Sequence, residues 1–166
     1  MAAEVLRGKT VRDAIGDFPR PGRTGDALHD LVVEHSPRIR ALIRDIPKDG
    51  GSRSDLPLSR QLDCHRRCDG FKDIYGRMAW DDVAPTITGG CFNPSRGRFL
   101  HPQQNRAITL REAAVLQTFP RRYRFILSHG KQSIALMIGN AFPPEVARRH
   151  AVEVARILRT NGGIFE

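Results

Sequence analysis

Residues 106–120 read RAITLREAAVLQTFP, and this stretch carries the clearest local signals in the chain. Thr109 stands three residues before Glu112, the spacing of a capping box, in which the hydroxyl and the carboxylate each bind a backbone N–H of the first turn. The apolar residues that follow keep helical spacing until Pro120, which cannot extend a helix. We therefore predict a helix that begins after Thr109 and ends before Pro120.

Further helices are predicted on both sides of this stretch. Towards the N-terminus, a second capping box indicates a short helix at residues 10–16, and a Ser-Pro start indicates another at 36–47. Towards the C-terminus, a short helix is predicted at 133–138 with Gly139 at its end, and paired prolines at 143–144 open the last helix.

The last predicted helix has one apolar stripe. Its members repeat every 3.6 residues and are Ala147, Ala151, Val154, Ala155 and Leu158. An apolar stripe of this kind packs on another hydrophobic surface.

The region between residues 58 and 102 has a different pattern, with β-prone pieces separated by glycines and prolines. Candidate strands lie at 74–80, 85–88 and 98–100. The predicted order is therefore helices, an irregular β region, and helices again.

Length and composition exclude several classes of protein. The chain has 166 residues with 27 Lys+Arg against 18 Asp+Glu, a formal charge of +9. One domain is the default at this length, and no apolar run reaches a membrane span. Residues 1–12 carry no apolar segment typical of a signal peptide, so we do not expect secretion. An odd number of cysteines argues against a disulfide framework. We expect a soluble, intracellular and basic protein.

Arginines are concentrated in the second half of the chain. The densest cluster is opposed only by Glu112 and consists of Arg96, Arg98, Arg106, Arg111, Arg121, Arg122 and Arg124. Such a cluster suits a phosphate-binding surface, and a solvated basic face is the competing interpretation.

No recognisable active site follows from residue patterns alone. Cys64 and Cys68 have a C-x₃-C spacing that a structural zinc site can use, with Cys91 and His101 downstream, but there is no second tight pair. Ordinary free thiols are the favoured interpretation, and no metal site is predicted. The chain also has no glycine-rich phosphate loop.

Two segments, however, are specific when taken together and in order. RAITLREAAVLQTFP and IGNAFPPEVA (138–147) resemble the ninth and tenth conserved blocks of the DNA (cytosine-5) methyltransferases. The stretch YGRMAWDDVAPTITGGCFNPSRGRFLHP (75–102) resembles the end of that family's target-recognition region. A weaker similarity reaches TVRDAIGDFP at 10–19, so the resemblance covers nearly the whole chain.

The resemblance implies a fold and a division of the chain. It implies an α+β fragment, with an irregular β-containing target-recognition lobe flanked by helices. In the intact family, the C-terminal helix completes a Rossmann-like α/β domain, most of which this chain lacks. We therefore expect the apolar stripe of the last helix to be exposed, and the isolated chain to be unstable or to associate until a second chain covers it. Residues 1–105 would then form the DNA-binding region, and 106–166 the two family blocks with the helix that packs on a missing or partner cofactor domain.

The resemblance also implies roles for particular residues. Gly139, Asn140 and Ala141 would line a pocket for S-adenosylmethionine, next to a helix N-terminus that favours a carboxylate. Residues with a structural role would be Arg106, Arg111 and Glu112. Residues that contact double-stranded DNA would be Thr86, Asn93, Ser95, Arg96 and Arg98. Each of these positions also has an ordinary interpretation as a helix cap, strand residue or solvated loop.

Departures from the family pattern are equally informative. Val115 stands where an arginine is usual, and Met137 where many members have glutamine. The glycine-rich cofactor loop, the Pro-Cys segment, the Glu-Asn-Val segment and the Arg-x-Arg segment are all absent. Because none of the cysteines follows a proline, we predict no catalytic residue in this chain and no activity without help.

These observations predict the C-terminal portion or small subunit of an S-adenosylmethionine-dependent DNA (cytosine-5) methyltransferase. Its expected partners are double-stranded DNA and a complementary methyltransferase chain that carries the catalytic cysteine. The alternatives are a stand-alone DNA-binding module and an inactive truncated product. No membrane partner is expected, and the resemblance implies a cytoplasmic, nucleoid-associated protein.

Overall fold

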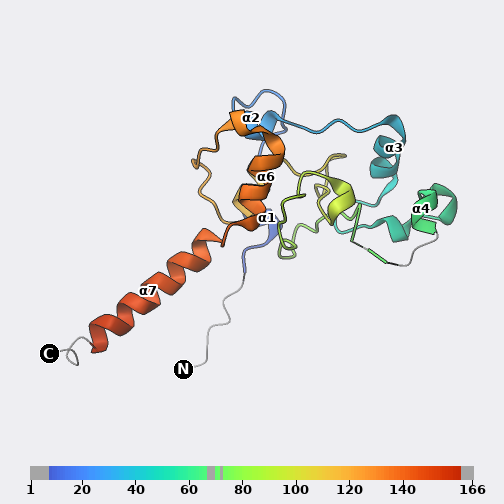
Figure 1. Ribbon diagram of the computed structural model, residues 1–166. Helices are drawn as coiled ribbons and strands as arrows, with labels where there is room; N and C mark the ends of the chain where they lie inside the picture. Colours follow the sequence, from blue (N-terminus) through green and yellow to red (C-terminus); the bar gives the residue numbers. More distant parts are fainter. Residues whose placement is uncertain (1–7, 67–69, 72, 162–166) are drawn as a thin grey trace.

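The computed structural model describes residues 8–66, 70–71 and 73–161, in which helices alternate with long irregular segments (Figure 1). The α-helices are α1 (Val11–Ile15), α2 (Ala27–Asp30), α3 (Pro37–Asp45), α4 (Asp63–Arg66), α5 (Leu110–Leu116), α6 (Gly130–Asn140) and α7 (Pro144–Asn161). Short 3₁₀ turns lie at Arg53–Asp55, Leu58–Arg60, Pro94–Arg96 and Leu127–His129. Among the described residues, no helix combines the length and the apolar character that crossing a bilayer requires.

Four of the helix starts that the sequence predicted are confirmed. Capping boxes with both reciprocal hydrogen bonds open α1 at Thr10 and α5 at Thr109. Ser36 caps α3, with a proline in the first turn, and Pro144 begins α7. Short-range side-chain bonds to the first backbone N–H groups therefore set the starts of α1, α3 and α5.

Two hydrophobic clusters hold the helices together. The larger cluster packs α1, α5 and α6 against one another, and its fully buried members include Val11, Ile15, Leu110, Ala113, Ile134 and Ile138. The second cluster lies around α3 and contains Leu42, Ile43, Ile46, Leu56, Tyr75 and Leu100. The larger cluster contains residues from both predicted regions, 1–105 and 106–166. The boundary after residue 105 therefore remains a prediction about function.

The regular strands predicted between residues 74 and 100 do not form in the described part of the chain, and this prediction was wrong. Leu100 makes a parallel bridge to Arg77 and an antiparallel bridge to Ala107, and neither extends into a ladder. Tyr75 adopts a left-handed conformation (φ 58°), which interrupts the extended run there. The β structure of this region is therefore limited to isolated bridges.

Helix α6 is longer than the sequence predicts at both ends, because it begins at Gly130 instead of Ser133 and Gly139 lies inside it instead of ending it. The helix continues to Asn140, and Ala141 is its C-terminal cap. A Cβ atom at position 139 would lie 2.2 Å from the backbone atoms of Thr88 and Gly89. This glycine therefore serves the close approach of α6 to the segment 88–89.

The last helix, α7, extends away from the rest of the molecule (Figure 1). Its apolar stripe is exposed in the described residues, with Val154 at 55% and Leu158 at 63% of full exposure. The expectation that this stripe lacks a covering surface in the isolated chain is thus met by the structure.

Candidate functional site

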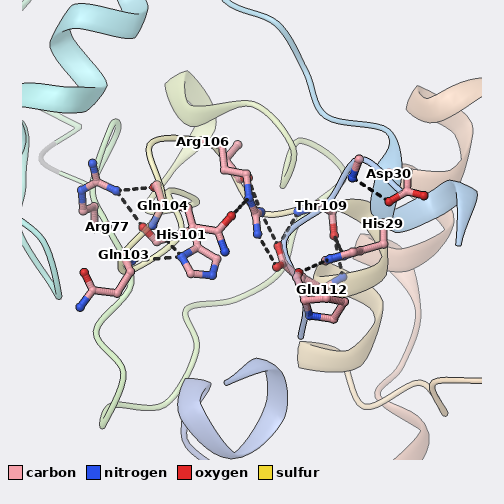
Figure 2. Close-up of polar contacts among 12 residues, drawn as sticks. His29, Asp30, Arg77, His101, Gln103, Gln104, Arg106, Thr109 and Glu112 are labelled. Atoms are coloured by element: carbon pink, nitrogen blue, oxygen red, sulfur yellow. Dashed lines mark hydrogen bonds and ion pairs between the residues drawn. The ribbon is translucent and has the colours of Figure 1, made fainter. Parts of the chain in front are cut away.

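A buried ion pair organises the start of α5 (Figure 2). Both Nη atoms of Arg106 donate to the two carboxylate oxygens of Glu112 at 2.7 Å, and the side chains are only 8% and 0% exposed. Oε2 of Glu112 also accepts the Thr109 N–H at 2.8 Å. Burial alone would raise the pKa of Glu112, but the bonds from Arg106 outweigh it and the pKa lies below its usual value.

A second ion pair connects α5 to the loop before α2. Nε and Nη2 of Arg111 donate to the Asp26 carboxylate at 2.5 and 3.3 Å, and Nη1 donates to the Tyr123 carbonyl at 2.7 Å. Arg106, Arg111 and Glu112, for which the resemblance implied structural roles, thus all lie in ion pairs that join separate segments.

His29 and Asp30 add two links that residue patterns did not single out (Figure 2). The buried His29 ring lies 3.0 Å from the Thr109 hydroxyl and 2.9 Å from the Pro19 carbonyl. The Asp30 carboxylate accepts backbone N–H groups of residues 22, 24 and 25, and these bonds lower its pKa to about 2. The loop before α2 is therefore held on α5 by hydrogen bonds.

Arg77 is the main residue that the sequence analysis missed. Its side chain is fully buried, and burial lowers its pKa to about 10. The guanidinium donates to the carbonyls of Ile43 (2.6 Å), Ile46 (3.2 Å), His101 (2.8 Å) and Gln104 (2.7 Å) and to Oδ1 of Asn105 (2.8 Å). Within the described residues no carboxylate pairs with it. Arg77 therefore connects the end of α3 to the turn before Arg106, and the only sequence signal was an arginine in a β-prone apolar run.

That turn is shaped by His101, another buried side chain. Its Nδ1 accepts the N–H groups of Gln103 and Gln104, each at 3.0 Å. Burial, together with the nearby Arg106, lowers the pKa of His101 to about 4. The ring is therefore neutral at pH 7, as an Nδ1 acceptor requires.

The predicted cofactor residues meet a predicted DNA residue at the end of α6. A hollow of about 540 Å³, which we call the α6 hollow, is lined by Ala84, Pro85, Thr86, Ile87, Leu116, Gln117, Gly139, Asn140, Ala141, Phe142 and Pro143. Nε2 of Gln117 donates to the Ala141 carbonyl at 2.8 Å and fixes the wall. Thr86 and Asn140 are both exposed there.

The other predicted DNA residues are divided by the structure. Oδ1 of Asn93 accepts the N–H and the hydroxyl of Ser95 at 3.0 and 2.8 Å, and Arg96 follows in the same exposed turn. Asn93 and Arg96 line a second hollow of about 460 Å³ beside α6. Arg98 instead donates Nη1 to the carbonyls of residues 50 and 77 at 2.8 and 3.0 Å. Part of the Arg98 guanidinium is thus occupied by hydrogen bonds within the chain. A contact between Arg98 and DNA remains a prediction.

Comparison with known proteins places these features in a family. The sequence profile of the C-5 cytosine-specific DNA methylases matches residues 8–156. The chain belongs to this methylase family. The match includes both conserved segments quoted above and the buried Arg106–Glu112 pair.

Curated relatives agree with this assignment. The chain is 40% identical to the type II methylase M.HgiDII of Herpetosiphon aurantiacus over 159 residues, which cover 90% of the chain and 44% of that protein. It is 37% identical to the type II methyltransferase M1.BsuMI of Bacillus subtilis over 124 residues, 74% of the chain and 28% of that protein. It is also 39% identical to the mouse DNA (cytosine-5)-methyltransferase 1 over 85 residues, 49% of the chain and 5% of that protein. The chain therefore spans less than half the length of these methylases.

Among the described thiols of this methylase-family chain, Cys91 does not have the properties of an activated nucleophile. Cys91 is buried, and burial raises its pKa to about 12. Cys64 is an exposed free thiol, and Cys68 lies outside the described residues. Among the residues that the structure describes, no three His, Cys, Asp or Glu side chains are grouped as metal ligands.

Proposed function

We propose that this chain is the C-terminal, DNA-recognising part of an S-adenosylmethionine-dependent DNA (cytosine-5) methyltransferase. The observation that carries the proposal is the α6 hollow, which brings Thr86, the residue assigned to DNA, next to Gly139, Asn140 and Ala141, the residues assigned to the cofactor. A methyl donor and a target base must come together in such a place for methyl transfer to occur.

The residues at the α6 hollow suit the polar end of the cofactor. Among the described residues no charged side chain lines the hollow, and the polar side chains there are Thr86, Gln117 and Asn140. The Asn140 amide can donate to a carboxylate, beside the start of α7, where helix N–H groups favour negative charge. The cofactor supplies the methyl group when bound, whereas this chain supplies one wall of its pocket.

The catalytic cysteine and the rest of the pocket come from elsewhere in this proposal. Neither Cys64 nor Cys91 follows a proline, and the buried Cys91 stays protonated at neutral pH. The exposed stripe of α7 supplies the contact surface, since in the family this helix completes a Rossmann-like domain. A methyltransferase segment or chain with the missing segments would therefore cover Val154 and Leu158.

A complementation assay tests the proposal. The purified chain is mixed with an upstream methyltransferase chain that carries the Pro-Cys and glycine-rich segments, and transfer of labelled methyl groups to double-stranded DNA is measured. We expect methylation only in the mixture. Sequence-specific DNA binding by the chain alone, without methylation in the mixture, would instead favour the stand-alone module. If neither methylation nor sequence-specific binding is observed, the inactive truncated product is favoured.

Helix α7 offers a matched pair of variants for this assay. Val152 and Val154 are both exposed, at 57% and 55%, and being two residues apart they lie on nearly opposite sides of the helix. Val154→Glu places a charge on the apolar stripe and should abolish complementation, whereas Val152→Glu should preserve it. Equal effects of the two substitutions would contradict the assignment of this stripe as the contact surface.

A further inference from the structure

The structure divides the arginine cluster between residues 96 and 124 into two groups. Arg98, Arg106 and Arg111 are engaged by carbonyls and carboxylates, as described above. Arg121 donates Nη1 and Nη2 to the Asp17 carboxylate at 2.7 and 2.5 Å, and it also lies over the Phe18 ring. The remaining three, Arg96, Arg122 and Arg124, are exposed and have no ion pair within the described residues.

Arg122 and Arg124 lie on a well-supported part of the connection between α5 and α6. Phe119, Tyr123 and Phe125 pack on one another, with ring centroids 4.8–5.4 Å apart. The Tyr123 carbonyl accepts Nη1 of Arg111 at 2.7 Å, which ties the backbone to α5. Phe119 and Phe125 pack on the larger hydrophobic cluster and hold the segment on the body, whereas Arg122 and Arg124 remain in solvent.

We propose that Arg122 and Arg124 form a phosphate-binding strip that contacts the DNA backbone outside the turn at residues 93–98. This inference rests on the proposed function, because it assumes that the chain engages a DNA duplex. Two guanidinium groups two residues apart can each bind a phosphate through a pair of N–H donors. Since Arg122 and Arg124 have no carboxylate partner within the described residues, binding a phosphate breaks no ion pair that the structure shows.

DNA fits this strip better than a protein partner does. The outward groups are two guanidiniums and the partly exposed Tyr123, whose hydroxyl can also donate to a phosphate oxygen. Exposed Ile126 and Leu127 follow the strip, so an acidic protein surface is the alternative that the experiment must exclude.

The test measures binding of the full chain to a fluorescent DNA duplex by anisotropy over a series of salt concentrations. Each phosphate contact contributes about 0.9 to the slope of log K against log salt. The double variant Arg122→Gln/Arg124→Gln should therefore reduce the magnitude of the slope by about 1.8, equally for duplexes of different sequence. The control, Arg156→Gln/Arg159→Gln, removes the same charge from exposed positions on α7, outside the region assigned to DNA, and should leave the slope unchanged.

The outcomes separate this inference from the proposed function. If the wild-type chain binds DNA and the Arg122/Arg124 variant keeps the wild-type slope, the inference is overturned. An acidic protein surface would then be the favoured partner of the strip. An equal loss in both double variants would indicate net charge alone and would also overturn it. If the wild-type chain shows no salt-dependent binding, both the inference and DNA recognition by this chain fail.

Discussion

Replacing Glu112 with glutamine should destabilise the protein far more than replacing an exposed acid. Glu112 is fully buried and takes two 2.7 Å bonds from Arg106. The substitution keeps the shape but leaves the Arg106 charge buried without a counter-charge. Breaking a buried pair in this way costs about 3–5 kcal/mol of unfolding free energy. At this chain length the melting temperature should fall by roughly 6–20 °C.

Urea denaturation followed by far-UV circular dichroism measures the effect. The matched control is Glu153→Gln, which removes the same charge from an exposed pair with Arg156 on α7 and should leave the midpoint unchanged. The double variant Arg106→Met/Glu112→Leu should recover much of the loss, because it removes both buried charges. If Glu112→Gln unfolds at the same urea concentration as Glu153→Gln, the buried pair does not have the role described here.

The same pair has a pH signature. Because the pKa of Glu112 is lower in the folded protein than in the unfolded chain, its contribution to stability is present above the unfolded value and is lost as pH falls through the folded value. Glu112→Gln should therefore flatten the loss of stability in acid. A variant with an unchanged acid profile would count against the depressed pKa.

Three further predictions concern other buried groups. His101 has a folded pKa of about 4, so stability should fall as the pH drops from 6.5 towards 4; His101→Asn should flatten this slope in urea midpoints, and a wild-type slope in the variant would contradict it. Gly139→Ala should lower the melting temperature, because overpacking costs about 1–3 kcal/mol of stability and outweighs the preference of alanine for helices. A melting temperature equal to or above that of the wild type would show that α6 and segment 88–89 are not in close contact. Peptide mapping after alkylation of the native protein should show Cys64 modified and Cys91 protected until unfolding, and equal rates would refute the burial of Cys91.

Local signals predicted the helices because the interactions that start a helix span only three or four residues. The pairs Thr10–Asp13 and Thr109–Glu112 can be recognised in the sequence for this reason. The strands were predicted incorrectly because β pairing depends on distant partners. A β-prone composition does not show whether a partner strand lies alongside.

The buried polar residues show the same limit more sharply. Arg77 and Arg98 are both arginines in a basic chain, and the sequence counts them as surface charge. Each instead binds backbone carbonyls of segments more than 20 residues away. Only the fold brings those carbonyls together. For the same reason, the block IGNAFPPEVA could predict the residues on the cofactor side of the α6 hollow, but it could not predict that Thr86 lies next to them.

Helix α7 has a consequence for the energetics of association. Its 18 residues extend roughly 27 Å, and a free helix of about this length is marginally stable in water. Once a covering surface binds the apolar side, the measured affinity includes the free energy of forming the helix itself. Substitutions on the solvated side, such as additional pairs like Glu145–Arg149, would then tighten association without touching the partner. The binding strength of this chain could thus be adjusted at positions that make no intermolecular contact.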